Sequence, residues 1–126
     1  MPYYVHDFHN PKFGIRKRLH AYQKLVSSGL LDHLVSLNKA TVVILFGSFS
    51  RWDWYKDSDV DIFIYGDDVG FEQSKYESKL HRGIQVHLAK NKKDLIKINK
   101  MMPYIIAGDF IKGSIEDLGI TIETNV

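Results

Sequence analysis

The spacing of hydrophobic residues divides the chain into helical and extended segments. From Ile15 to Val26, apolar side chains recur every three or four residues, which is typical of an amphipathic helix. Gly29 is expected to end this helix, and a second helical run covers residues 30–37. Further helical segments are predicted at residues 48–55, 71–80 and 95–105, the last with a new turn beginning at Pro103.

Extended segments lie between these helices. Residues 41–46 are β-branched and continuously apolar, which is typical of a strand buried on both faces. Residues 60–65 form a second strand, and residues 84–88 alternate apolar with polar side chains, which indicates a third. A last short strand is predicted at residues 120–122. This order predicts an α/β or α+β domain with a small mixed sheet and flanking helices.

Composition narrows the class of protein. The chain has 126 residues and no cysteine, which excludes disulfides, cysteine metal sites and a thiol nucleophile. Its net charge of +2 does not favour nucleic-acid or membrane binding. No apolar run could span a bilayer, and the N-terminus lacks the pattern of a secretory signal. We expect a cytoplasmic protein with one domain over residues 1–126, including an N-terminal helical extension at about residues 1–38.

Two short motifs carry the chemistry. Gly47 and Ser48 follow a buried strand and precede a predicted helix, where backbone amides and the helix dipole favour an anion. Asp59 and Asp61 begin the next strand, and residues two apart project to the same face, about 6–7 Å apart. Two such carboxylates repel each other unless a cation such as Mg²⁺ lies between them. An anion site beside paired carboxylates suits metal-assisted phosphoryl or nucleotidyl transfer.

Either motif alone is common in solvated turns, whereas the pair at fixed spacing is specific. The stretch GSFSRWDWYKDSDVDIFI resembles the signature of the DNA polymerase beta-like nucleotidyltransferase superfamily, and in particular its minimal single-domain members. Trp52 stands where the family pattern has glycine. The residues that match the pattern are Gly47, Ser48, Arg51, Ser58, Asp59, Asp61 and the apolar run 62–64.

The resemblance implies roles for these residues. Gly47 and Ser48 would hold the triphosphate of a nucleotide, with Arg51 either near the phosphates or on the surface. Asp59 and Asp61 would bind Mg²⁺ or Mn²⁺ and act in catalysis. The donor would be ATP or another nucleoside triphosphate. Minimal relatives are often encoded beside a small all-helical toxin of the HEPN type, and they act as antitoxins that adenylylate a tyrosine of that partner.

The strand at residues 84–88 departs from the family pattern. Active relatives carry a third carboxylate there, but this strand has no Asp or Glu. Gln85 and His87 face away from its apolar row, and either could occupy the third position. Glutamine cannot act as a base, whereas a neutral imidazole can, so His87 is the candidate catalytic substitute. A packed or solvated strand histidine is the alternative.

Three other features of the sequence have more than one interpretation. His6 and His9 could share a metal, although no carboxylate nearby completes a set. The aromatic residues Trp52, Trp54 and Tyr55 could stack on a base or form a partner surface. A basic stretch is expected to be a solvated helix face, with RNA or an acidic partner as the alternative; it comprises Lys90, Lys92, Lys93, Lys97 and Lys100.

Two functions therefore remain. The first is a Mg²⁺-dependent nucleotidyltransferase that moves AMP from ATP to a hydroxyl. The second is a catalytically weakened domain of the same fold that acts by binding a protein or a nucleotide. The paired carboxylates favour the first, and the missing third carboxylate favours the second. The sequence leaves the acceptor and any homo-oligomer undetermined.

Overall fold

A computed structural model describes residues 22–47 and 59–119. Residues 22–28 are helical, and Gly29 separates them from α3. The elements that follow are α3 (Leu30–Val35), β1 (Ala40–Phe46), β2 (Val60–Gly66), α4 (Gln73–Leu80), β3 (Ile84–Ala89), α5 (Lys92–Lys97), α6 (Met102–Ile106), β4 (Asp109–Lys112) and the 3₁₀ helix η2 (Ile115–Leu118).

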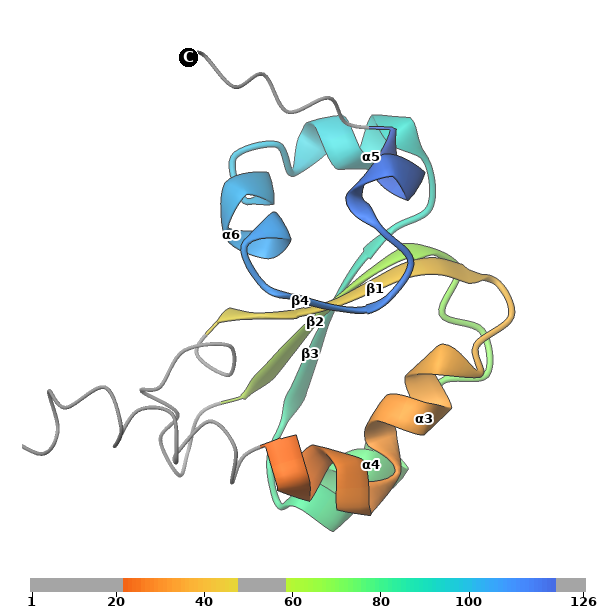
Figure 1. Cartoon of the computed structure of the whole chain (residues 1–126), viewed down its shortest axis with the longest axis vertical. Helices are drawn as coiled ribbons and strands as arrows, with labels where there is room; N and C mark the ends of the chain where they lie inside the picture. Colours follow the sequence, from red (N-terminus) through yellow and green to blue (C-terminus); the bar gives the residue numbers. More distant parts are fainter. Residues whose placement is uncertain (1–21, 48–58, 120–126) are drawn as a thin grey trace, which may run out of the picture.

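The four strands form one mixed sheet in the order β3-β2-β1-β4. The central strand β1 is antiparallel to both β2 and β4, whereas β2 is parallel to β3. Helices α3 and α4 cover one face of the sheet, and α5 and α6 cover the other (Figure 1). The predicted mixed sheet with flanking helices is therefore confirmed.

The two central strands are buried on both faces, so the protein has two hydrophobic cores. In β2, Val60, Ile62 and Ile64 belong to the core beneath α3 and α4, as their spacing predicted. Phe63 points the other way and is fully buried with Met102 and Ile105 of α6. This alternation also directs Asp61 toward the side of the sheet that α5 and α6 cover.

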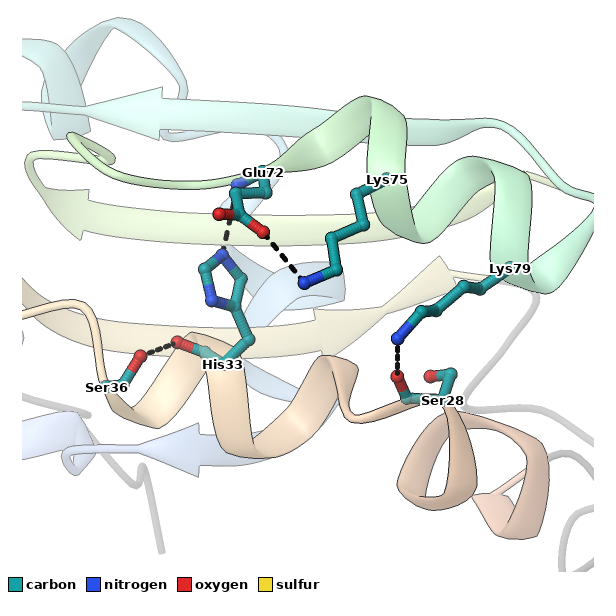
Figure 2. Close-up of polar contacts among 6 residues, drawn as sticks. All are labelled: Ser28, His33, Ser36, Glu72, Lys75 and Lys79. Carbon is teal, nitrogen blue, oxygen red and sulfur yellow. Dashed lines mark hydrogen bonds and ion pairs between the residues drawn. The ribbon is translucent and has the colours of Figure 1, made fainter.

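Polar contacts connect α3 to α4 (Figure 2). The Nε2 atom of His33 accepts a hydrogen bond from the backbone N–H of Glu72 at 3.0 Å. Its ring stacks on Tyr76, with 4.9 Å between centroids, and on Phe71, with 5.7 Å. These contacts fix the start of α4 against α3.

The C-terminal half differs from the sequence prediction. The helical segment predicted over residues 95–105 forms the end of α5 and then α6, and Pro103 lies in the first turn of α6, as the sequence predicted. Helix α5 begins earlier than expected, because Asn91 caps it through a hydrogen bond from Asp94 N–H. Strand β4 was not predicted. The expected helix at 48–55 and strand at 120–122 lie outside the described residues. Within residues 22–47 and 59–119, no helix is long and apolar enough to cross a membrane.

Candidate functional site

Asp61 lies at one end of the central strand pair. It is the second residue of β2 and faces Phe46, the last residue of β1, in the antiparallel register. Gly47 follows Phe46 with a φ of 77°, and a Cβ atom there would overlap the Asp61 carboxylate. Glycine is therefore favoured at this position for two reasons: it permits the left-handed backbone conformation, and it leaves room for the Asp61 carboxylate.

Asp59 lies directly before β2, next to the start of β3. The N–H of Val60 donates to the Gly83 carbonyl at 2.9 Å, which joins the two strand starts. A Cβ atom on Gly83 would lie 2.7 Å from Asp59 Oδ1, so the exposed Asp59 carboxylate rests against the bare Gly83 backbone. The two aspartates are near enough for the charge of Asp59 to act on Asp61.

The electrostatics of Asp61 are unfavourable in the protein alone. Its side chain is 24% exposed, and burial raises the pKa of this carboxyl above its usual value. The neighbouring Asp59 charge raises the pKa further, while His87 acts in the opposite direction. A cation in front of the two carboxylates would favour the ionised form and remove this penalty.

His87 is the third polar group at this end of the sheet. It lies on β3, and its Nε2 atom is 3.5 Å from Asp61 Oδ1, too long for a good hydrogen bond. Nε2 is buried and has no hydrogen-bond partner among the described residues. The Phe46 ring packs against the imidazole with 5.1 Å between centroids and 60° between ring planes. His87 is thus held with Nε2 toward Asp61.

The other candidate for the third position is placed differently. Gln85 pairs with Asp61 in the parallel register, but its side chain is exposed, whereas that of His87 is 29% exposed and contacts Asp61. Of the two residues that the sequence left open, His87 is the one beside the carboxylates. Its catalytic role stays a prediction.

The sequence motif implies a divalent metal ion at these two carboxylates. In the described part of the chain, no group of three or more His, Asp or Glu side chains is arranged to hold a metal ion. Mg²⁺ commonly takes only one or two protein carboxylates, with substrate phosphates and water completing its shell. The two neighbouring carboxylates of Asp59 and Asp61 fit such an ion, because Mg²⁺ and Mn²⁺ both prefer oxygen ligands.

Several residues singled out in the sequence lie outside the described residues. These are Ser48, Arg51, Ser58, the aromatic residues 52, 54 and 55, and His6 and His9. The basic stretch is described: all five of its lysines are exposed, as expected for a solvated face, and Lys97 lies 4.0 Å from Asp94.

Sequence reasoning missed Gly83 and Phe46 as neighbours of the site. In the sequence, Phe46 looks like any other core residue of an apolar strand. Gly83 looks like an ordinary residue between a helix and a strand. Only the pairing of β2 with both β1 and β3 brings these two residues to the carboxylates. The one available signal was that Gly83 directly precedes the strand that carries His87.

Gly83→Ala provides a local test of this arrangement. Gly83 does not have a positive φ, so the backbone accepts alanine and the main conflict is with the Asp59 carboxylate. We expect the new methyl group to displace Asp59 and to lower nucleotidyl transfer by about tenfold to a hundredfold. In an Asp59→Asn background, where Asp59 no longer contributes a charge, the added alanine should change the rate little. An equal loss in both backgrounds would contradict this contact.

The chain matches the family model described as "Polymerase beta, Nucleotidyltransferase" over residues 30–115. It belongs to this family. The match begins at the first residue of α3 and includes Gly47, both aspartates and His87. No curated protein and no solved structure matched the chain. Membership of the nucleotidyltransferase family supports nucleotidyl transfer as the general chemistry of this domain.

Proposed function

We propose that this domain transfers a nucleoside monophosphate, AMP from ATP, to a hydroxyl group in the presence of Mg²⁺ or Mn²⁺. The observation that carries the proposal is the position of Asp61. Its carboxylate lies against Gly47, near Asp59 and beside His87, and its pKa is raised by burial. Such a carboxylate is best satisfied by a cation brought together with the phosphates of a nucleotide.

In the proposed reaction, the acceptor hydroxyl oxygen attacks the α-phosphorus of ATP. A new oxygen–phosphorus bond forms, the bond between the α-phosphorus and the oxygen bridging to the β-phosphate breaks, and pyrophosphate leaves. Asp59 and Asp61 would hold the divalent cation. When bound, that ion supplies charge stabilisation to the phosphoryl oxygens. Gly47, where a Cβ atom would overlap the Asp61 carboxylate, would also let the nucleotide phosphates approach the backbone closely.

His87 is proposed to receive the proton of the acceptor hydroxyl. A neutral imidazole accepts a proton at Nε2 or Nδ1, which Gln85 cannot do. Two features support this role: Nε2 has no hydrogen-bond partner among the described residues, and Phe46 fixes the ring. The adjacent Asp61 carboxylate, 3.5 Å from Nε2, would stabilise the protonated ring.

The acceptor and setting follow from the resemblance to minimal nucleotidyltransferases. We propose a tyrosine hydroxyl of a small helical partner of the HEPN type, which would make this chain an antitoxin that acts in the cytoplasm. A tyrosine supplies the hydroxyl nucleophile that the proposed chemistry needs.

One observation favours the second function, a domain that binds without efficient catalysis. The described strand β3 carries Gln85 and His87 where active relatives keep a carboxylate. If His87 does not accept a proton, the same carboxylates and glycine turn would still bind a nucleotide and its cation. A thermal-unfolding assay with nucleotide, paired with a transfer assay, separates the two functions.

We expect ATP with Mg²⁺ to stabilise the wild-type protein against thermal unfolding. A ligand that binds only the folded state adds about 2.7 kcal/mol at a hundredfold excess over its dissociation constant. The Asp59→Asn/Asp61→Asn variant should lose this increase, because it lacks both proposed ligands of the cation. Equal shifts in both proteins would place the nucleotide elsewhere, and shifts without any transfer would favour the binding function.

A further inference from the structure

A hollow lies on the other side of the sheet from His87, where the helix of residues 22–28 meets the end of α4. Its volume is about 440 Å³, which is within the range of small-ligand sites. Its wall consists of Lys24, Ser27, Ser28, Lys79, Leu80 and His81. Leu80 packs against the core beneath α3 and α4, so this hollow is separate from the carboxylate site.

The wall of this hollow is basic. It has two lysines and a histidine but no aspartate or glutamate. Lys75, one turn earlier on α4, is paired with Glu72 at 3.2 Å, whereas Lys79 contacts the backbone carbonyl of Ser28 at 3.3 Å (Figure 2). Both ammonium groups lie over the Tyr76 ring, at 5.5 and 5.4 Å. The two lysines therefore differ in two ways: Lys75 is paired with a carboxylate, and only Lys79 borders the hollow.

Lys79 is held in place and retains donors for a ligand. An ammonium group has three N–H donors, and the contact with Ser28 uses one of them. The carbonyls at this helix end already accept hydrogen bonds: Lys24 from the Ser27 hydroxyl, Leu25 from the Ser28 hydroxyl, and Val26 from the N–H of Gly29. The hollow thus presents ammonium groups rather than unpaired carbonyl oxygens.

We propose that this hollow is a binding site for the phosphate group of a small anion, either free pyrophosphate or phosphate or the phosphates of a nucleotide. Lys24 and Lys79 would donate charge-assisted hydrogen bonds to its oxygens, with His81 at the rim. The site does not depend on the proposed catalytic function. His81 is two residues before Gly83, which lies against Asp59, so a short loop connects the rim of the hollow to the start of β3.

The test measures binding of inorganic pyrophosphate to the full chain by calorimetry, with a chelator and without divalent cations. We expect saturable binding that Lys24→Gln and Lys79→Gln each weaken at least about tenfold. Lys75→Gln is the matched control and should bind as the wild type does. Lys79→Arg keeps the charge and should retain most of the affinity. Unfolding midpoints of all variants show that each is folded, and Lys24→Gln carries the test should Lys79→Gln unfold.

Three results would overturn the proposal: no saturable binding to the wild-type protein, equal weakening by Lys75→Gln and Lys79→Gln, or wild-type affinity in both Lys24→Gln and Lys79→Gln. Because no cation is present, the carboxylates of Asp59 and Asp61 repel pyrophosphate, and the result is independent of whether transfer occurs. Repeating the measurement with inorganic phosphate and with ATP shows whether the bound phosphate belongs to a free anion or to a nucleotide. Tighter binding of pyrophosphate than of ATP supports a free anion, and the reverse supports a nucleotide.

Discussion

Asp61→Asn is expected to lower nucleotidyl transfer by about a thousandfold or more. Charge stabilisation through a bound metal contributes several kcal/mol to the transition state, and each 1.36 kcal/mol is a factor of ten in rate. Asparagine has nearly the shape of aspartate, so the contacts with Gly47 and His87 keep their space. The loss would therefore report the missing negative charge.

The stability of this variant should change in a different way from its activity. Burial raises the pKa of Asp61 in the folded protein, so the ionised carboxylate is less favourable there than in the unfolded chain at neutral pH. Replacing it by an amide should maintain or increase the free energy of unfolding. Chemical denaturation measures this quantity, and release of pyrophosphate in the presence of Mg²⁺ and acceptor measures the rate.

Asp67→Asn is the matched control for charge. Asp67 follows the opposite end of β2, where its Oδ1 atom accepts a hydrogen bond from the N–H of Val69 at 3.0 Å. We expect this variant to transfer at close to the wild-type rate. A wild-type rate in Asp61→Asn, or an equal loss in Asp67→Asn, would remove Asp61 from the proposed mechanism.

The part of the fold that positions the carboxylates could be predicted because its signals are local. The apolar runs in β1 and β2 mark buried strands. The two-residue period of a strand places the side chains of Asp61 and Ile62 on opposite faces of the sheet. The break at Gly47 is a glycine with positive φ directly after a buried strand. These features depend on neighbouring residues in the chain, so the spacing of two short motifs was enough to find them.

The features that could not be predicted depend on pairing between distant segments. Strand β4 has only four residues, with Asp109 and Lys112 at its ends, and forms because β1 offers it an open edge. Tyr22 donates a hydrogen bond to Asp109 from 87 residues away, which also holds this strand. In the same way, the choice between Gln85 and His87 needed the register of β3 against β2 and the burial of each side chain.

The second large effect is expected at His87. His87→Ala should lower transfer by about a hundredfold to ten-thousandfold, the usual contribution of a general base. It should leave the stabilisation by ATP and Mg²⁺ nearly intact, because the proposed cation ligands remain. Phe46 would lose its ring contact, so the free energy of unfolding must be measured alongside the rate.

Two further replacements at His87 separate the roles of the ring. His87→Gln keeps a polar group of similar size that cannot take a proton, and it should be nearly as slow as His87→Ala if His87 is the base. His87→Asp places a carboxylate beside Asp61, as active relatives have on this strand, and should recover much of the rate. A wild-type rate in His87→Ala would exclude His87 from the reaction. A further outcome is that the wild type shows no transfer while His87→Asp shows a clear gain in rate. One residue on β3 would then account for the missing activity, and the protein would be a naturally weakened nucleotidyltransferase that acts by binding.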